Sequence, residues 1–298
     1  MRPGVLILAG PTASGKTELA LDLARSFDAE IVGADSRQIY RGMPIGTAAP
    51  TAQQRAQVPH HLIEFLDPRE RYSAARFASD AVAAIEDMHA RGKRAIVVGG
   101  TGFYIRALTG AVTLAPEYDD ALRERLSQEA RLHEATFLYE WLTIRDPRRA
   151  AQLEPADTYR VLRALEVALA PAESRLRQGN LTSLKSTGIP FAKVFLNVDR
   201  DTLDERIELR TSRMLQDGLI EEAERIGPHA VASSAVGYPQ ALAYLRGWCT
   251  HDELRSLLVR TTRRYARRQV TWFRSEPETL WLPPERIEQT AREKLGWV

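Results

Sequence analysis

The stretch Gly10-Pro11-Thr12-Ala13-Ser14-Gly15-Lys16-Thr17 decides the fold expected for this chain. The apolar residues 5–9 before it are typical of a buried strand, and residues 18–24 after it have helical spacing. Between a strand and a helix, the pattern G-x-x-x-x-G-K-[ST] binds phosphate, because backbone N–H groups and the helix N-terminus favour anions. The pattern predicts an oligophosphate site with Mg²⁺ as cofactor, the Thr17 hydroxyl being its metal ligand. The phosphate-binding residues predicted are Gly10, Thr12, Ala13, Ser14, Gly15, Lys16 and Thr17.

Length and composition limit the classes of protein that the chain can represent. Its 298 residues suit one large α/β domain or a core with an inserted subdomain. The single cysteine, Cys249, excludes an internal disulfide and a cysteine-based zinc site. No apolar run approaches the ~18 residues of a membrane span, and residues 5–9 are better read as a core strand than as part of a signal peptide. We expect a cytoplasmic monomer without a membrane partner.

The net charge of +2 does not by itself indicate a nucleic-acid-binding protein, but the distribution of arginine is more informative. Arginines concentrate late in the chain, at Arg260, Arg263, Arg264, Arg267, Arg268 and Arg274. On a helix most of them occupy a different arc from Leu254, Leu258 and Tyr265, which is compatible with an ordinary solvated amphipathic helix. Because residues 257–274 contain almost no acidic partners, a polyanionic ligand explains the cluster better.

The order of predicted elements indicates an α/β fold with a P-loop NTPase-like core and a parallel sheet. Strand-like runs at residues 5–9, 30–34, 94–98 and 191–198 are expected to form the sheet, with a possible late strand at 279–282. Between about 113 and 188 charged residues alternate with Leu and Ala at helical spacing. We therefore predict a core of residues 1–112 and 189–298, and an all-helical insertion at 113–188 that caps the core.

Asp35 is the first candidate for catalysis. It follows a strand expected beside that of residues 5–9, and ligands of parallel sheets bind at the carboxyl ends of the strands. There its carboxylate could act as a general base, although Asp35 and Ser36 could instead cap the next segment. Thr101, within Gly99-Gly100-Thr101-Gly102, could hold a ligand or simply begin a helix. No acidic residue ends the run 94–98, as a Walker-B strand would require, which favours group transfer over nucleotide hydrolysis.

Two further patterns remain ambiguous from spacing alone. Arg206 and Arg210 stand four residues apart on a predicted helix and could clamp a diphosphate, or belong to an ordinary surface lattice of ion pairs. His60 and His61 are adjacent, so that they point to different faces, and no further ligand follows at suitable spacing. We interpret the histidine pair as structural.

Over nearly its whole length the chain resembles the tRNA dimethylallyltransferases, also called IPP transferases. The motifs that carry the resemblance are residues 10–17, Ala34-Asp35-Ser36-Arg37-Gln38-Ile39-Tyr40-Arg41-Gly42-Met43, 45–48, 60–63, 98–102, 163–167, 214–222 and 264–274. The family transfers a dimethylallyl group from dimethylallyl diphosphate to N6 of the adenine beside the anticodon of tRNA. That base must leave its stack to be reached, which suits an unpaired loop nucleotide.

The resemblance implies roles for individual residues. Asp35 would accept the proton of the adenine amine, and Thr101 would help to hold the adenine or the reacting centre. The loop Thr12 to Thr17 would bind the diphosphate together with Mg²⁺. The residues implied to contact the tRNA anticodon stem-loop are Asp35, Ser36, Arg37, Gln38, Thr101, Arg123, Tyr159, Arg160 and Arg163. The chain departs from the family pattern at Pro44, Ala49, Tyr159 and Pro239. Tyr159 replaces a glutamine next to Arg160, which bears on that RNA contact.

Three alternatives fit parts of the pattern. An enzyme that prenylates free AMP or ATP would use the same chemistry but would not need the helical insertion or the basic residues 260–274. A P-loop kinase of small molecules would need ATP and a set of lid arginines. A non-catalytic, nucleotide-gated RNA-binding module would leave Asp35 without a task. The first measurement that separates them is which acceptor receives the prenyl group.

Overall fold

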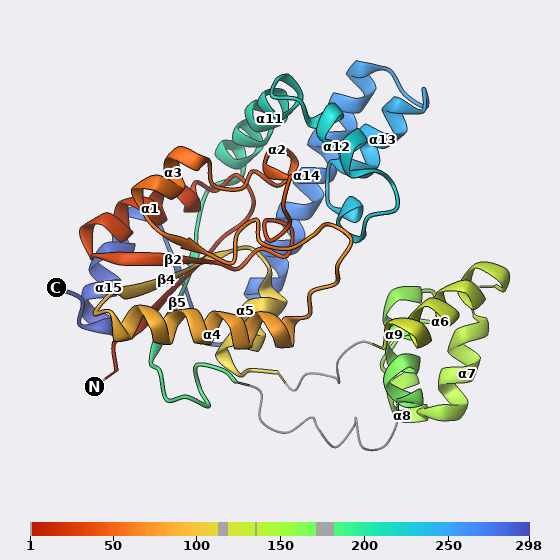
Figure 1. Cartoon of the computed structure of the whole chain (residues 1–298), viewed down its shortest axis with the longest axis horizontal. Helices are drawn as coiled ribbons and strands as arrows, with labels where there is room; N and C mark the ends of the chain where they lie inside the picture. The colour runs from red at the N-terminus through yellow and green to blue at the C-terminus, as the bar shows by residue number, and fades with distance from the viewer. Residues whose placement is uncertain (1, 113–118, 135, 171–181) are drawn as a thin grey trace. The chain divides into compact units, whose positions relative to one another are not determined.

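The chain divides into two compact units, Met1–Ala111 with Thr182–Val298, called the core unit, and Val112–Leu181, called the helical unit. The computed structural model describes residues 2–112, 119–134, 136–170 and 182–298 (Figure 1). The expected end of the insertion at residue 188 falls later than the observed boundary. Residues 182–188 belong to the core unit, because fully buried Leu184 donates its backbone N–H to the carbonyl of Leu108 at 2.8 Å.

A parallel six-stranded sheet forms the centre of the core unit, in the order β3-β2-β4-β1-β5-β6. Its strands are β1 (Val5–Ala9), β2 (Ala29–Gly33), β3 (His60–His61), β4 (Arg94–Gly99), β5 (Phe191–Leu196) and β6 (Thr279–Leu282). The apolar runs of the sequence form β1, β2, β4 and β5, which are buried almost throughout, whereas the edge strands β3 and β6 are partly exposed. The α/β class and the parallel sheet are thus confirmed.

One expectation about the sheet is wrong. The strand before Asp35 does not lie beside β1, because β4 is inserted between β2 and β1 and pairs with both. Asp35 nevertheless remains at the carboxyl edge, since Ala34 N donates to Val98 O at 2.7 Å and Thr101 N donates to Ala34 O at 3.2 Å. These two hydrogen bonds therefore join the segments that follow β2 and β4 at the carboxyl edge of the sheet.

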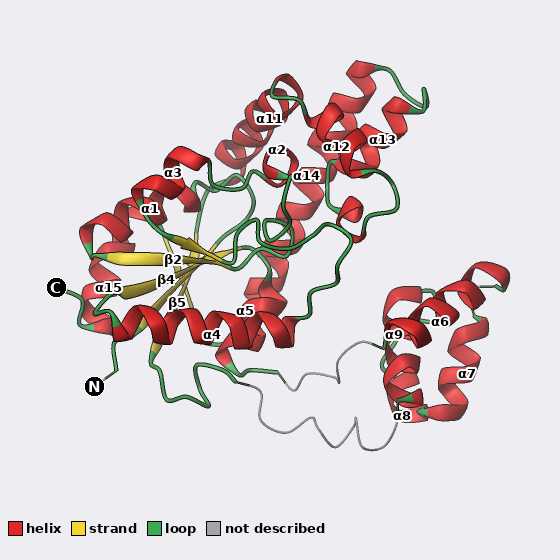
Figure 2. Ribbon diagram, viewed as in Figure 1, coloured by secondary structure: helices red, strands yellow, loops and turns green. Residues whose placement is uncertain are grey.

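Helices cover both faces of the sheet (Figure 2). The helices of the core unit are α1 (Lys16–Ser26), α2 (Pro44–Thr47), α3 (Ala52–Gln57), α4 (Ala74–Ala90), α5 (Gly102–Thr109), α11 (Arg200–Gln216), α12 (Leu219–Ile226), η1 (Val231–Ser234), α13 (Tyr238–Leu245), α14 (His251–Arg274), η2 (Pro284–Arg286) and α15 (Ile287–Leu295). Leu6 and Leu8 face α1 and α15, where they form one core with residues such as Leu23 and Ile287. Phe195 points to the opposite face and packs on Phe273 of α14, with ring centroids 4.8 Å apart.

Two of the departures from the family pattern have simple structural settings. Pro44 opens α2 and Pro239 lies in the first turn of α13, where the N–H that proline lacks would have no helical partner. Neither proline therefore disturbs the fold.

The helical unit contains α6 (Asp120–Leu132), α7 (Phe137–Arg145), α8 (Pro147–Ala150) and α9 (Thr158–Leu169). Leu138 and Leu142 of α7 pack with Val161 and Leu165 of α9 in a small apolar core of its own. The expectation that residues 171–181 continue the helical insertion lies outside the described residues.

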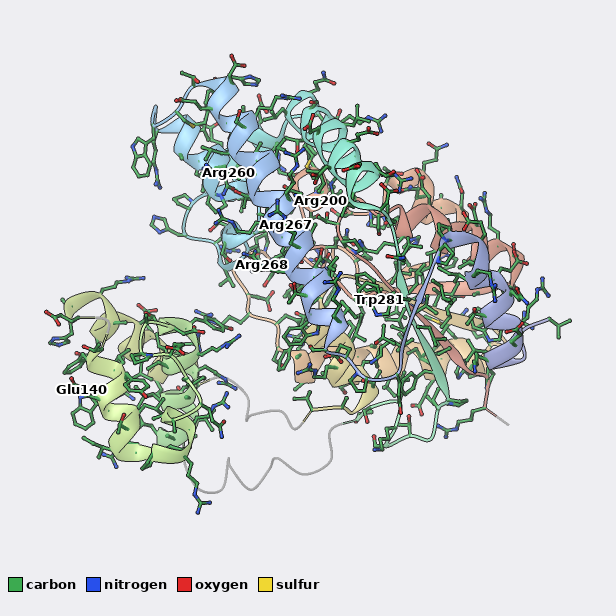
Figure 3. The ribbon with its side chains drawn as sticks, turned by 180° about the vertical axis from the view of Figure 1, so that it is seen from behind. Glu140, Arg200, Arg260, Arg267, Arg268 and Trp281 are labelled. Carbon is green, nitrogen blue, oxygen red and sulfur yellow. The ribbon has the colours of Figure 1, made fainter. Side chains whose placement is uncertain are left out.

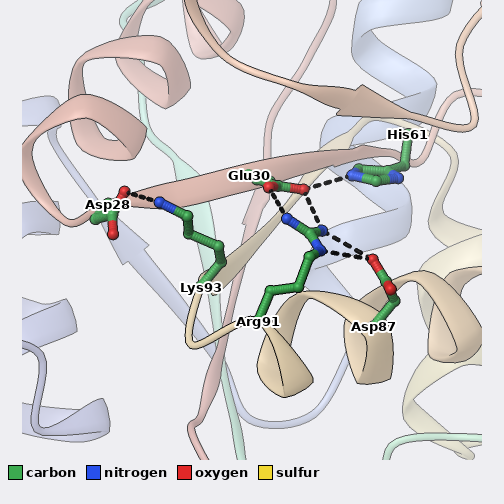
Figure 4. A network of polar contacts seen from close by, with 6 residues as sticks. All are labelled: Asp28, Glu30, His61, Asp87, Arg91 and Lys93. Atoms are coloured by element: carbon green, nitrogen blue, oxygen red, sulfur yellow. Dashed lines mark hydrogen bonds and ion pairs between the residues drawn. The ribbon is translucent and has the colours of Figure 1, made fainter.

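The histidine pair has a structural setting. His61 Nε2 lies 2.7 Å from Glu30 Oε2, and Arg91 forms an ion pair with the same carboxylate (Figure 4). His60 Nδ1 lies 2.7 Å from the carbonyl oxygen of Val58. The arginine holds the pKa of Glu30 down at about 2 despite burial, with a smaller contribution from His61. The network joins β2, β3 and the end of α4, which agrees with the structural interpretation.

Candidate active site

The Gly10–Thr17 loop connects β1 to α1 at the carboxyl edge of the sheet. Gly15 has φ +87°, a backbone angle that favours glycine, and α1 begins at the next residue. Lys16 Nζ donates to the carbonyl oxygen of Pro11 at 3.1 Å, so the side chain folds back over its own loop. Burial lowers the pKa of Lys16 to about 8, although the nearby Asp35 carboxylate opposes this effect. An anion bound at the loop would therefore stabilise the protonated form of Lys16.

Two hydroxyl groups of the loop bear on whether phosphate and Mg²⁺ fit. Ser14 Oγ is buried and has no hydrogen-bond partner among the described residues, so it is an unsatisfied donor in a loop of phosphate-binding sequence. Thr17 is half-buried in the first turn of α1. The described residues contain no cluster of three or more His, Cys, Asp or Glu side chains. The Thr17 hydroxyl is an oxygen ligand of the kind that Mg²⁺ accepts, and Mg²⁺ takes most of its other ligands from water and substrate phosphates.

Helix α11 contributes two arginines to the loop and its surroundings. Arg206 Nη1 donates to Ser14 O at 3.1 Å, and Arg210 Nη2 donates to Thr47 O at 3.4 Å. The ambiguity left by their spacing is thus resolved in part: both point towards the sheet edge. Burial lowers the pKa of Arg210, while Asp35 raises it. Lys16, Asp35 and Arg210 consequently form one local group of charges.

Asp35 and Thr101 come from neighbouring strand ends. Thr101 Oγ1 accepts a hydrogen bond from Ser36 N at 3.0 Å, and Asp35 Oδ1 accepts one from Arg37 N at 2.9 Å. Thr101 also precedes α5, but its side chain does not cap that helix. Gln38 donates its amide to Thr47 O and Ala48 O, at 3.2 and 3.0 Å, so this amide serves an internal contact. The backbone after β2 is therefore held by side chains on both sides of Asp35.

Gln269 of α14 is a site residue that sequence reasoning missed. Its Oε1 accepts from Thr12 N at 2.8 Å, and its Nε2 donates to Gly100 O at 3.0 Å. A Cβ at Gly100 would lie 2.0 Å from Gln269 Nε2, so this glycine admits the glutamine rather than a ligand. One buried amide thus joins the phosphate-type loop to the loop that carries Thr101. Only the position of Gln269 within the motif 264–274 hinted at a role.

A cavity of about 240 Å³ lies beside Asp35 and Arg210 and reaches Thr12 of the Gly10–Thr17 loop. Its polar part contains Thr12, Asp35 and Arg210, and its apolar part contains Met214, Leu219 and Leu258. The complete lining is Thr12, Asp35, Ser36, Arg37, Gly46, Thr47, Arg210, Thr211, Met214, Leu219, Ser234, Ala235, Val236, Gly237, Leu258, Thr262, Tyr265 and Arg268. This cavity can hold an ionic group and a short hydrocarbon in one molecule.

Tyr265 and Arg268 also line the cavity, a placement that the sequence did not predict. Burial raises the pKa of Tyr265, and the Asp35 carboxylate raises it further. The guanidinium of Arg268 lies 5.7 Å from the centre of the Tyr265 ring. The phenol therefore stays protonated next to Asp35, and Arg268 presents a charge that the sequence could assign only to a general basic helix.

A buried carboxylate braces the α2 side of the cavity. Glu222 accepts hydrogen bonds from Ile45 N at 3.0 Å, from Gly46 N at 2.7 Å and from Tyr238 Oη at 2.8 Å. A Cβ at Gly46 would approach Tyr238 to 2.6 Å, so only glycine fits there. These contacts fix the segment whose Thr47 carbonyl receives Arg210.

The RNA-contact candidates of the helical unit differ in accessibility. Arg123 is only 6% exposed, and its Nη1 donates to Glu166 Oε2 at 2.8 Å. This buried pair joins α6 to α9, so Arg123 has a structural partner, and its contact with RNA stays a prediction. Arg163 pairs with the same glutamate at 2.5 Å. Tyr159 and Arg160 are exposed, and remain the accessible candidates on α9.

The chain is similar to known proteins in both sequence and structure. A family model described as IPP transferase matches residues 38–276. A tRNA dimethylallyltransferase of Geobacter sulfurreducens is 42% identical over 283 residues, which are 93% of this chain and 91% of that protein. No described helix is long and apolar enough to cross a membrane.

Solved structures give the same assignment. The tRNA isopentenylpyrophosphate transferase of Bacillus halodurans has a TM-score of 0.70 and 33% identity, covering 99% of this chain and 97% of that one. A eukaryotic dimethylallyltransferase acting on tRNA has a TM-score of 0.76 and 26% identity, covering 97% of this chain and 76% of that one. Both similarities extend over nearly the whole chain.

Proposed function

This chain belongs to the IPP transferase family, and from that premise we propose that it is an enzyme that transfers a dimethylallyl group to tRNA. The donor is dimethylallyl diphosphate, and the acceptor is N6 of the adenine next to the anticodon. The observation that carries the proposal is the cavity in which Asp35 and Arg210 share one space with Met214 and Leu219. A five-carbon chain with a diphosphate needs this combination of apolar and charged surface.

The diphosphate would lie against the Gly10–Thr17 loop. Ser14 Oγ offers an unused donor, Lys16 a cation with a lowered pKa, and Arg206 and Arg210 two guanidinium groups near the loop. These groups stabilise the negative charge that develops on the departing diphosphate. Thr17 would hold Mg²⁺, which neutralises diphosphate charge when bound.

Asp35 is the base of the proposed reaction. The bond between C1 of the dimethylallyl group and the diphosphate oxygen breaks, and the electron pair leaves with diphosphate. A bond forms between C1 and N6, and one N6 proton passes to the Asp35 carboxylate. Thr101 positions the general base Asp35, because Thr101 Oγ1 accepts a hydrogen bond from the neighbouring Ser36 N at 3.0 Å. The segment from Asp35 to Gln38, together with Arg160 and Tyr159, would meet the anticodon stem-loop.

The active unit is proposed to be a monomer, and its compartment to be the cytoplasm, where its tRNA substrate would be found. Sedimentation of the free protein and of its tRNA complex would measure the oligomeric state. A stoichiometry of two chains in the active complex would contradict it.

The experiment that tests the function uses Mg²⁺, labelled dimethylallyl diphosphate and unmodified tRNA, with AMP and ATP in parallel reactions. Label is expected in tRNA alone. Label in AMP or ATP would replace the proposal by nucleotide prenylation, which shares the donor site but not the acceptor. Absence of transfer to all acceptors would reject prenyl transfer.

A further inference from the structure

Helix α14 separates two cavities of the core unit. Leu258, Thr262 and Tyr265 line the cavity that contains Asp35. A different arc of the same helix lines a second cavity of about 460 Å³, with Ala266, Val270 and Arg274 among its residues. The second cavity is completed by Pro11 of the Gly10–Thr17 loop, by residues of β5 and β6, and by the start of α11. No step of the proposed reaction uses it.

The second cavity is strongly basic. Arg200, Arg263, Arg267 and Arg274 line it, with Asp204 as the single carboxylate. Arg263 is neutralised, because it pairs with Asp204 at 3.1 Å and with Glu208 at 2.7 Å. Arg200, Arg267 and Arg274 make no ion pair among the described residues, and all three are exposed. The cavity therefore presents several uncompensated guanidinium groups to an incoming anion.

The position of Arg200 argues against a purely structural role for this charge. It is the first residue of α11, where the positive end of the helix dipole disfavours a cation. An anion bound in the cavity would offset that repulsion. Arg274, in contrast, lies in the last turn of α14, where the helix dipole favours a cation. Arg200 is therefore the stronger indication of a bound anion.

An aromatic wall faces the same space. Trp281 of β6 lines the cavity and is half-exposed, while its ring packs on Phe195 with centroids 4.2 Å apart. Figure 3 shows Arg200, Arg267 and Trp281 on the face seen from behind. Guanidinium groups beside an anchored indole are the combination that binds a phosphate together with a nucleobase.

We propose that this second cavity binds a nucleotide unit, separate from the reacting adenine. Arg200, Arg267 and Arg274 hold its phosphate, and Trp281 stacks with its base. The unit is either a free nucleotide or one unpaired nucleotide of a bound tRNA; the latter case rests on the proposed function. Binding there adds affinity without touching the groups around Asp35.

The test compares two double variants that remove the same charge from α14. Arg267→Ala/Arg274→Ala alters the cavity, whereas Arg260→Ala/Arg264→Ala removes exposed arginines that line neither cavity. Both are made with Lys16→Ala, so that phosphate at the Gly10–Thr17 loop contributes little. Affinities for AMP, ATP and unmodified tRNA are measured by titration calorimetry and fluorescence anisotropy. We expect the cavity variant to lose about tenfold more affinity than its control.

A Trp281 series tests the stacking part. Trp281→Leu should weaken binding, and Trp281→Phe should restore most of it, while urea unfolding of both variants measures any loss of packing on Phe195. Loss with AMP, ATP and tRNA identifies a free-nucleotide site, and loss with tRNA alone identifies a tRNA nucleotide. Equal losses in the two arginine variants would overturn the proposal. Failure of wild-type protein to bind tRNA would contradict the proposed function, while the AMP and ATP titrations would still decide the cavity.

Discussion

Single residues around the strand ends carry the chemistry, and Asp35 carries most of it. Asp35→Asn keeps the size of the side chain and the acceptor for Arg37 N but removes the base. We expect turnover to fall far more than tenfold with tRNA affinity nearly unchanged, measured by single-turnover transfer and by tRNA binding. Retention of more than about a tenth of the rate, a loss below ~1.4 kcal/mol, would show that Asp35 is not the base.

Lys16 gives a second prediction at the residue scale. Its pKa is lowered to about 8, so free protein loses this charge as the pH rises through that value. A bound diphosphate stabilises the protonated form, and binding should therefore take up a proton above pH 8 and weaken towards pH 9.5. Calorimetry in buffers of different ionisation enthalpy measures the uptake. Lys16→Met should abolish it, and an unchanged uptake in that variant would assign the proton to another group.

At the scale of elements, one side chain joins two loops. Gln269 of α14 satisfies Thr12 N and Gly100 O, so Gln269→Ala leaves two buried polar groups unpaired. We expect a loss of about 1–3 kcal/mol of stability and a raised KM for dimethylallyl diphosphate. The matched control is Gln289→Ala on α15, whose exposed amide donates to the exposed Glu293 of the same helix. An unchanged KM for dimethylallyl diphosphate in the Gln269 variant would show that Gln269 stabilises the fold but does not position the loops for the donor.

The link between β2 and α4 predicts a pH dependence of stability. The pKa of Glu30 is lowered from 4.5 to about 2, so its contribution is complete above pH 4.5 and is lost as the pH falls towards 2. Glu30→Gln should flatten that part of the stability curve, measured by urea unfolding at several pH values. Glu288→Gln, at an exposed pair with Arg292, should leave the curve unchanged. Parallel curves for wild type and Glu30→Gln would contradict the assignment.

At the scale of the whole molecule, we expect the helical unit to contribute to tRNA binding and not to binding of dimethylallyl diphosphate. Arg160, with 66% of its side chain exposed, can contact phosphate, whereas Arg123 is buried against Glu166. Arg160→Ala should weaken tRNA binding and reduce its salt dependence while folding is kept. Arg123→Ala should instead destabilise the helical unit, because Glu166 would lose a buried partner. Salt titrations of tRNA affinity and thermal unfolding distinguish the two variants.

Short-range sequence signals predicted much of the fold and part of the site. The strands before Gly10, before Asp35 and before Gly99 were predicted because buried parallel strands are continuous apolar runs. The placement of β4 between β1 and β2 was not, since the order of strands depends on pairing between distant segments. Gln269 and Glu222 were missed for the same reason: a buried polar residue acquires its role only from its partners.

The sequence by itself predicted the phosphate-type loop, the α/β class, the helical insertion and the family, because each motif behind these predictions lies within a short stretch of the chain. The tertiary structure decided which charges meet. It buried Arg123, placed Tyr265 beside Asp35, and turned two arcs of α14 towards separate cavities. Burial and proximity set both the pKa and the accessibility of a charged group, and neither is a property of local sequence.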